Sequence, residues 1–251
     1  MRNYLAAECY KVFRRKYLYI ALAVCLALES LLLWGTWLTC SWGNPSITFY
    51  STAIMVAMLL SFGMYATFLT GDVVFSEQYK HTTLKNEVSY GLPRTRIYLG
   101  KLTISILVAL IACAVLVGFY LAGCWFLYPH DGMDAKALEL VLYCLAGALP
   151  LWLAAQAVVI ACYFQVRGST MAAFTGIAIL AVLPPVFEVF GLIFHPVFEM
   201  LRQVIPAVMM EQLRNAAFDW GYVGQCWLVG LVWFAAATAL GLGLFRKKEI
   251  R

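Results

Sequence analysis

Six stretches of this chain are apolar over a length that can cross a membrane, and they limit the fold more than any motif does. A transmembrane helix needs ~20 predominantly apolar residues. The six stretches are Tyr17–Thr39, Ile47–Thr70, Leu102–Leu127, Ala137–Phe164, Met171–Phe194 and Tyr222–Phe245. They lack the period-two alternation of transmembrane strands, and helices satisfy their own backbone groups in lipid. We therefore predict an all-α integral membrane protein with six transmembrane helices.

The low charge content supports this prediction. Only 12% of the 251 residues are charged, whereas soluble domains contain ~25%, so the chain has too little polar surface for a water-soluble globule. No long linker or second composition appears along the chain. Residues 1–251 are therefore expected to form a single transmembrane domain.

The positions of Lys and Arg predict how the chain is oriented. Of the 18 basic residues, all but Lys136, Arg202 and Arg214 lie before the first stretch, between the second and third, after the fourth or behind the sixth. Basic residues accumulate on the cytoplasmic side of membrane proteins, so both termini are expected in the cytoplasm and the protein in the plasma membrane. The net charge of +5 does not indicate nucleic acid binding, because these residues flank spans. Their expected partner is the lipid bilayer.

Residues 1–16 have the pattern of an amphipathic helix lying in the membrane interface. Apolar residues recur at i, i+4, i+7 and i+8, namely Leu5, Cys9, Val12 and Phe13. The charged residues fall largely on other faces, and these are Glu8, Lys11, Arg14 and Arg15. We predict an interfacial helix with its basic residues toward lipid headgroups; an ordinary basic tail is the alternative.

The eight cysteines do not indicate a metal site. They are scattered, mostly within apolar stretches, with no C-x-x-C pair and no His at ligand spacing. Such cysteines behave as small buried hydrophobes. Cys40 and Cys124, near the outer ends of predicted spans, are the one pair that is positioned for a disulfide. We predict no bound metal.

The polar loop at 71–101 is the longest interruption of the apolar pattern. From Ser76 to Val88 it contains good helix formers without Gly or Pro, and Tyr90-Gly91-Leu92-Pro93 then breaks the run. We predict a short helix roughly in the membrane plane. Because such a helix is rigid and joined to two spans, it can pass force from a soluble motor to the membrane; the alternative is that it only lies on the surface.

The order Glu77…Thr83-Leu84-Lys85-Asn86…Gly91-x-x-Arg94…Lys101 resembles the cytoplasmic signature of ABC-2 type transporter permease subunits, including those of drug export and of bacteriocin or antimicrobial-peptide immunity. Thr82 stands where that family usually has a glycine. The resemblance implies that this loop couples to an ATPase, through Glu77, Lys80, Thr83, Leu84, Lys85, Gly91 and Arg94. It also implies a bacterial exporter.

The same resemblance places ATP and Mg²⁺ on a separate ABC ATPase subunit and no cofactor on this chain. The sequence agrees, because it contains no G-x-x-x-x-G-K-[ST] phosphate loop. We therefore expect no enzymatic activity of its own. A second permease subunit, identical or similar, is also implied. The expected cargo is a peptide, an antimicrobial or an amphipathic drug.

Two carboxylates inside predicted spans are candidates for the translocation path. Glu29 lies midway along the first span, where a charge costs ~2.5–3.5 kcal/mol on insertion scales, so it should face protein or water. Glu188 follows Pro184-Pro185 in the fifth span. The alternative for Glu29 is a hydrogen bond to a neighbouring helix.

The extracellular segment at 195–220 contains further helix breakers. In the ABC-2 type permeases that this chain resembles, helical segments between the fifth and sixth spans dip back into the outer leaflet. We expect such re-entrant helical segments at 195–220. A kinked helix with a hydrated loop is the alternative.

Small residues at four-residue spacing mark the sixth span as a packing surface. They are Ala235, Ala239 and Gly243. We expect this surface to pack inside the subunit, with a second subunit as the alternative.

Two other classes of protein remain open. A non-transporting sensor or immunity protein would capture a peptide without ATP. An intramembrane enzyme would need paired catalytic groups on adjacent spans, but His81, His130 and His195 are all placed in loops and no G-x-S-x-G string is present.

Overall fold

The computed structural model describes residues 2–81, 83–166, 168–215 and 218–248, and of residues 2, 76–81, 83 and 214 it describes the backbone alone. All regular structure in this part is helical, as predicted. The helices are α1 Arg2–Phe13, α2 Lys16–Ser41, α3 Phe49–Ala53, α4 Val56–Tyr65, α5 Thr67–His81, α6 Thr83–Ser89, α7 Arg94–Leu127, α8 Asp134–Gln165, α9 Ser169–Ile193, α10 Val197–Gln203, α11 Pro206–Asn215 and α12 Trp220–Lys247.

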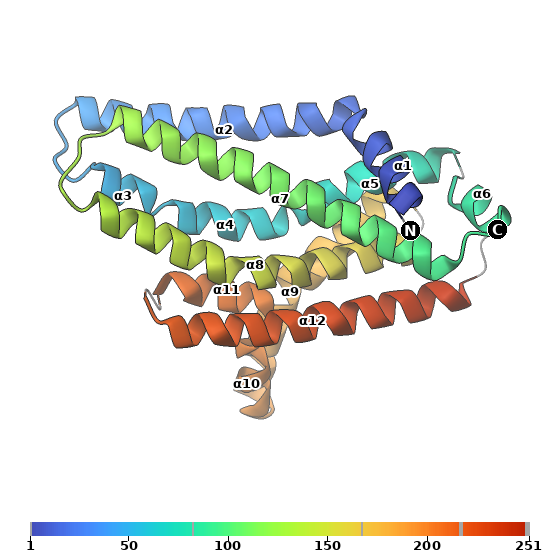
Figure 1. Ribbon diagram of the computed structural model, residues 1–251. Helices are drawn as coiled ribbons and strands as arrows, with labels where there is room; N and C mark the ends of the chain where they lie inside the picture. Colours follow the sequence, from blue (N-terminus) through green and yellow to red (C-terminus); the bar gives the residue numbers. More distant parts are fainter. Residues whose placement is uncertain (1, 82, 167, 216–217, 249–251) are drawn as a thin grey trace.

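Six segments are long and apolar enough to cross a membrane, which confirms the predicted spans. Five are the single helices α2, α7, α8, α9 and α12, and the other is the broken run Phe49–Phe75 formed by α3, α4 and the start of α5. Most of them run side by side in a bundle (Figure 1). The first and last described residues lie at the same end of this bundle, together with α6 (Figure 1). We call it the basic end, because Lys11, Arg94, Lys101, Arg246 and Lys248 gather there.

Side chains of neighbouring helices donate to backbone carbonyls along the interrupted second span. The Tyr120 hydroxyl donates to the carbonyl of Thr52 at 3.2 Å, and the Trp152 indole donates to that of Leu60 at 3.0 Å. The Tyr163 hydroxyl donates to the carbonyl of Phe68 at 3.2 Å. Aromatic donors from α7 and α8 therefore hold the interrupted span in place.

The core of the bundle is α8, and α12 packs along it. Both helices end at the basic end, so they run parallel (Figure 1). A Cβ atom added at Gly230 would lie 2.6 Å from the backbone of Pro150, and one at Gly241 would lie 2.8 Å from Cβ of Ala161. Small residues on α12 thus allow the close backbone approach that stabilises helix pairs in membranes.

This packing surface differs from the one predicted. The buried positions of α12 include Gly230, Ala237 and Gly241. By contrast, Ala235, Ala239 and Gly243 are exposed, and nothing lies within 4 Å of a Cβ added at Gly243. The prediction that these three residues pack inside the subunit is wrong, because α12 turns a neighbouring face toward α8. Packing against a second subunit stays a prediction.

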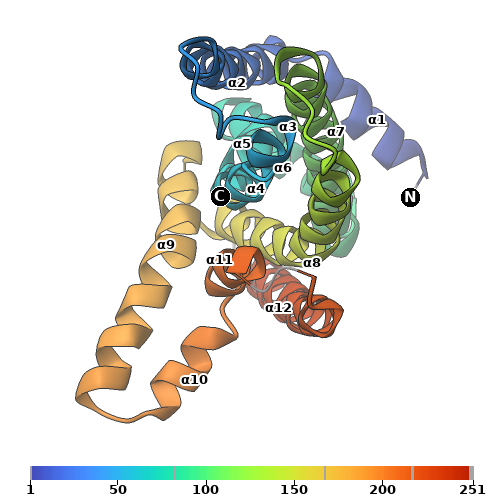
Figure 2. The same cartoon turned by 90° about the vertical axis from the view of Figure 1, so that its left-hand side faces the viewer.

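The fifth span leaves the bundle. Only Ala172, Gly176 and Leu180 of α9 are buried, and they lie on its first half. Beyond them, α9 and α10 form a hairpin that projects away from the other helices (Figure 2). Pro184 and Pro185 are both accommodated within α9 without ending it.

The segment after this hairpin returns into the bundle. The Trp233 indole donates to the carbonyl of Val204 at 2.8 Å. Because Trp233 stands near the middle of α12, the turn between α10 and α11 reaches the middle of the bundle. From there α11 packs closely on α8. A Cβ atom added at Gly147 of α8 would lie 2.6 Å from the side chain of Leu213 of α11. Much of the segment at 195–220 is therefore helical and in part buried.

All eight cysteines are free. Cys124 is buried, and the thiol of Cys40 donates to the carbonyl of Ile47 at 3.8 Å. The structure thus does not pair Cys40 with Cys124.

Candidate coupling site

The N-terminal helix α1 packs against the start of α7. A Cβ added at Gly100 of α7 would lie 2.5 Å from the ring of Tyr4, so the absence of a side chain there allows the ring to approach. Val12 is buried, as its place on the apolar face predicts. Glu8, which was expected on a polar outer face, is instead only 2% exposed. The prediction for Glu8 is wrong because a buried cation from another helix offsets its charge.

That cation is Lys101, a fully buried lysine of α7. Its Nζ lies 2.9 Å from Oε2 of Glu8, and Lys101 is 0% exposed. The exposed Lys11 places its Nζ 2.7 Å from the other oxygen of Glu8. Each oxygen of the Glu8 carboxylate therefore accepts a charge-assisted hydrogen bond, which is the arrangement that makes a buried ion pair tolerable.

Glu87 of α6 joins the same group of charges. Its Oε1 lies 3.6 Å from Nζ of Lys11 and 3.9 Å from Nζ of Lys101, and the Tyr4 hydroxyl donates to its Oε2 at 3.1 Å. We call Tyr4, Glu8, Lys11, Glu87 and Lys101 the charge cluster. It connects α1, α6 and α7, and its buried pair, Glu8 and Lys101, is 93 positions apart in the sequence.

The surroundings shift the pKa values of the cluster residues outside the spans. Burial alone would raise the pKa of the Glu8 carboxyl, but Lys101 and Lys11 outweigh it and hold the pKa below its ordinary value. Burial likewise opposes the charge of Lys11, yet the Glu8 and Glu87 carboxylates raise its pKa. Burial and the nearby carboxylates raise the pKa of the Tyr4 hydroxyl, so it remains a donor. Glu8 and Lys11 are therefore charged at neutral pH.

The loop at 71–101 forms a helix end, a short helix and a tight turn. Instead of one helix from Ser76 to Val88, α5 continues out of its span to His81 and α6 follows at Thr83–Ser89. The prediction of one separate helix is wrong because the change from apolar to polar residues does not by itself end a helix. Thr82 lies outside the described residues.

The predicted turn after α6 is present. Gly91 has φ of +81°, a left-handed conformation that favours glycine. Its N–H donates to the carbonyl of Val88, and that of Leu92 donates to Glu87, which together make a Schellman motif. Pro93 then precedes the first residue of α7. This turn fixes how α6 sits against α7.

The two faces of α6 differ. Leu84, Glu87 and Val88 are half-buried and face the bundle, whereas Lys85, Asn86 and Ser89 are exposed. Tyr90, at the end of the helix, is 88% exposed. The predicted coupling residue Lys85 is thus free to meet a partner, and Leu84 packs inward. Of the other predicted coupling residues, Glu77, Lys80 and Thr83 have side chains outside the described part.

Arg94 makes its contacts within the subunit. Its Nη1 donates to the carbonyls of Phe245, Arg246 and Lys248 at 2.9, 2.6 and 2.8 Å. A cation in this position satisfies carbonyls that the last turn of α12 leaves unpaired. The Lys248 Nζ in turn donates to the carbonyls of Phe164 and Gln165 at 2.8 Å, at the end of α8. Three helices are thereby tied together at the basic end.

The two candidate path residues lie in different surroundings. Oε2 of Glu29 is buried with no hydrogen-bond partner among the described residues. Glu29 shares a face of α2 with Leu18, Leu22 and Cys25, so it faces protein. The side chain of Glu188 is 51% exposed and lies 3.3 Å from Arg202 of α10, within the projecting hairpin.

The sequence analysis missed the roles of Glu8, Glu87 and Lys101. A signal was available for Glu8, because it is the sole acidic residue among the first sixteen and lies one position before the apolar Cys9. Nothing in the sequence shows that α1 crosses α7 at Gly100. Among the described residues, no group of three or more His, Cys, Asp or Glu could hold a metal.

Six segments long and apolar enough to cross a membrane, with an exposed short helix between the second and third of them, define a polytopic membrane protein. Residues 4–181 match the sequence model of a family described as ABC-2 family transporter protein. This match covers well over half of the chain, so the chain belongs to the ABC-2 family, as the resemblance predicted. It is a permease subunit of an ABC transporter. No curated protein matched the chain.

Proposed function

We propose that this permease subunit binds an ABC ATPase through α6 and that the charge cluster carries the movement of α6 to the membrane helices. The observation that supports this most directly is the buried pair of Glu8 and Lys101, with Glu87 of α6 beside both Lys11 and Lys101. ATP and Mg²⁺ would bind on the ATPase. The basic end would then face the cytoplasm, because basic residues accumulate on that side.

A buried charge cluster is suited to transmitting force. Separating one member leaves an uncompensated charge in a low-dielectric environment, which costs ~3–5 kcal/mol. Since α6 contributes Glu87 and Leu84 to the bundle, a push on α6 moves α7 and α1 with it instead of bending the loop. The Arg94 contacts extend the same connection to the end of α12. Movement at the ATPase would thus reach several spans together.

The exposed face of α6 is the proposed contact with the ATPase. The exposed side chains of α6 and of the residue after it are Lys85, Asn86 and Tyr90. This helix lies at the end of the molecule where both termini lie (Figure 1). Tyrosine is enriched at protein interfaces because it is apolar with a polar tip, and a ring that is 88% exposed has no packing role inside this subunit. We infer that Tyr90 packs against the ATPase.

A second permease subunit would complete the transport path. Two surfaces support such pairing: the projecting hairpin of α9 and α10, whose exposed residues include Leu192 and Phe194, and the small-residue stripe Ala235, Ala239 and Gly243. The cargo would cross between the two permease subunits. We propose export of peptides, antimicrobials or amphipathic drugs, as the family resemblance implies.

The test begins with co-purification. A Lys85→Glu, Tyr90→Ala double variant should lose at least about tenfold of the co-eluting ATPase, since a tyrosine at an interface hot spot contributes ~2 kcal/mol or more. Trp42→Ala is the matched control, because Trp42 is 79% exposed but lies at the opposite end. Mass spectrometry of the eluate identifies the ATPase and measures its ratio to the permease.

Coupling is tested separately from binding. In vesicles that contain the complex, Glu87→Gln should keep the ATPase bound while cargo-stimulated ATP hydrolysis and cargo uptake both fall. An amphipathic cationic peptide and a lipophilic dye would serve as the cargo probes. A permease that purifies without any ATPase and protects cells from a peptide in the absence of ATP would contradict the proposal and favour a sensor or immunity protein.

A further inference from the structure

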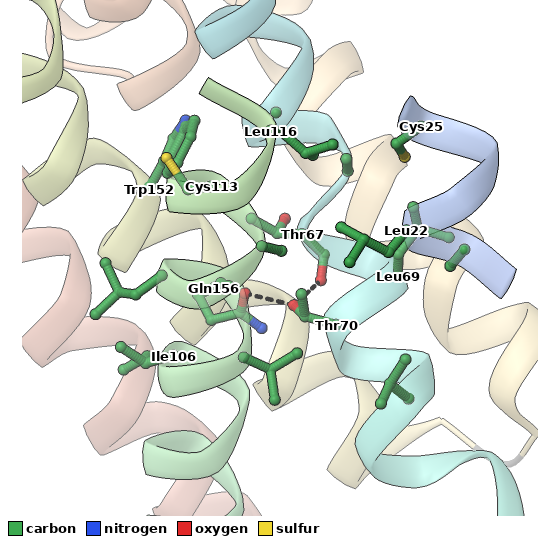
Figure 3. A pocket seen from close by; sticks show the side chains of 18 of the residues that line it. Leu22, Cys25, Thr67, Leu69, Thr70, Ile106, Cys113, Leu116, Trp152 and Gln156 are labelled. Atoms are coloured by element: carbon green, nitrogen blue, oxygen red, sulfur yellow. Dashed lines mark hydrogen bonds between the residues drawn. The ribbon is translucent and has the colours of Figure 1, made fainter. Parts of the chain in front are cut away.

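A narrow pocket lies inside the bundle, away from the charge cluster. It is enclosed by α2, α4, α5, α7 and α8, and Figure 3 shows side chains from several of these helices pointing toward a common space. Representative lining residues are Leu22, Cys25, Leu69, Cys113, Leu116 and Trp152. Nearly all the lining is apolar, and it includes Leu110, which is 41% exposed. The pocket therefore reaches the surface within the membrane span, where it meets lipid and not water.

The length of the pocket fits one leaflet of a bilayer. On α7 the lining runs from Ile106 to Leu116, and at 1.5 Å per residue this is about 15 Å along the helix. Half of a ~30 Å hydrocarbon core is about the same length. The volume is about 130 Å³, well below the ~300 Å³ of the smallest drug-sized pockets. A pocket of this length and volume encloses only part of one narrow chain, the rest of which lies at the opening, and it excludes a bulky cargo.

One polar side chain lines the pocket without a full set of partners. Gln156 of α8 is 2% exposed, and its Oε1 accepts a hydrogen bond of 2.7 Å from the Thr70 hydroxyl (Figure 3). Its Nε2 is buried and has no hydrogen-bond partner in the described part of the protein. A buried amide without a partner is unfavourable by ~1–3 kcal/mol. A ligand that brings a carbonyl oxygen would satisfy it.

The basic side of the pocket ends at the junction of α1 and α2. The Arg15 side chain donates to the carbonyl of Val73, and Val73 lines the pocket. The neighbouring Arg14 and Lys16 are exposed at this junction. Asp72 is the nearby carboxylate, and it accepts a hydrogen bond from Tyr17. Cations therefore outnumber anions at this end of the pocket.

We propose that the pocket holds one acyl chain of an anionic phospholipid from the leaflet at the basic end. The chain lies along Ile106–Leu116, the ester carbonyl accepts from Nε2 of Gln156, and the phosphate lies near Arg14 and Lys16. Each part of the lipid thus meets a matching part of the site. The lipid packs between α2 and the rest of the bundle and acts as a structural component of the subunit.

The test uses full-length protein in vesicles of phosphatidylglycerol that carries a photoreactive diazirine on one acyl chain. The protein is purified in mild detergent to remove loosely bound lipid and is then irradiated and analysed by mass spectrometry. We expect about one retained lipid per subunit, cross-linked to residues 106–116 or 18–25. Ala112→Phe fills the pocket and should reduce retention about tenfold. Gln156→Leu should weaken retention roughly three- to tenfold through the lost hydrogen bond.

Ala114→Phe is the matched control, because Ala114 is exposed on the same helix and does not line the pocket. It should retain lipid as the wild type does, and all variants are compared at equal monodispersity. Equal loss in Ala112→Phe and Ala114→Phe would overturn the proposal, as would a wild-type protein with no retained lipid or with cross-links on outer helix faces alone. Equal retention from phosphatidylcholine vesicles would overturn the assignment of the headgroup to Arg14 and Lys16.

Discussion

Two groups of charged side chains in this subunit are similar in geometry and opposite in burial. In the charge cluster, Glu8 and Lys101 are 2.9 Å apart and both are buried. In the hairpin, Arg202 lies 2.8 Å from Glu199 and 3.3 Å from Glu188, and all three are partly exposed. The distances alone would rank the two groups as equals. Burial separates them, because an exposed pair contributes ~0–1 kcal/mol whereas breaking a buried one costs ~3–5 kcal/mol.

The difference divides the subunit into a fixed part and an adjustable part. At the basic end, ion pairs and the Arg94 contacts join α1, α6, α7 and α12 to one another. In the hairpin, no residue of α9 beyond Leu180 is buried among the described residues. We infer that the hairpin adapts to a second subunit or to lipid while the basic end transmits movement.

The largest effect is expected from Lys101→Met. The substitution keeps most of the side chain's length but leaves the buried Glu8 carboxylate without its main partner, so the free energy of unfolding should fall by ~3–5 kcal/mol. Thermal unfolding in detergent, followed by size-exclusion chromatography, measures the change. Arg96→Met is the matched control, since Arg96 is exposed on the same helix. Similar stability in both variants would contradict the view that burial makes the cluster rigid.

Glu8→Gln should have a smaller effect that depends on pH, because the amide oxygen can still accept from Lys101 and the Glu87 carboxylate remains 3.9 Å from its Nζ. At pH 7 the loss should be ~1.5–3 kcal/mol, the contribution of a hydrogen bond to a charged group. Lys101 and Lys11 hold the pKa of Glu8 below its ordinary value despite burial. A carboxyl with a lowered pKa contributes stability above its unfolded pKa of about 4.3, and this contribution is lost as the pH falls through the folded pKa.

The difference between wild type and Glu8→Gln should therefore be full near pH 7 and shrink below about pH 4. Thermal unfolding of both proteins from pH 7 downward measures it. A difference that stays constant over this range would show that Glu8 contributes through packing and not through its charge.

The sequence predicted the fold better than it predicted this cluster. Apolar length locates the spans, and Gly91-Leu92-Pro93 predicts the turn after α6, because both signals are local. The pairing of Glu8 with Lys101 depends on where α1 crosses α7, which no local pattern encodes. The packing face of α12 was missed for a related reason: small residues occur on two neighbouring faces, and only the position of α8 selects Ala237 and Gly241 over Ala235 and Gly243.

Gly241→Ala tests the fixed part without changing any charge. A Cβ at this position would lie 2.8 Å from Cβ of Ala161 and would also crowd the Tyr98 hydroxyl, so α12 must shift away from α8. Overpacking of this kind costs ~1–3 kcal/mol. Gly243→Ala is the control, because its added Cβ meets nothing within 4 Å. Equal melting temperatures of the two variants would show that the contact between α8 and α12 is looser than these distances indicate.

The smallest effect is expected from Arg202→Gln in the hairpin. Losing both of its ion pairs should change the free energy of unfolding by less than ~1 kcal/mol, because Glu188 and Glu199 remain in contact with solvent. Thermal unfolding at low and high salt measures the change. High salt should abolish the small difference in stability between wild type and Arg202→Gln. A loss as large as that of Lys101→Met would mean that the hairpin is buried in the protein as purified. Since the isolated subunit leaves it exposed, such a result would point to a second permease subunit packed over α9 and α10, and cross-linking between copies at Glu188 would then distinguish this pairing from burial in lipid.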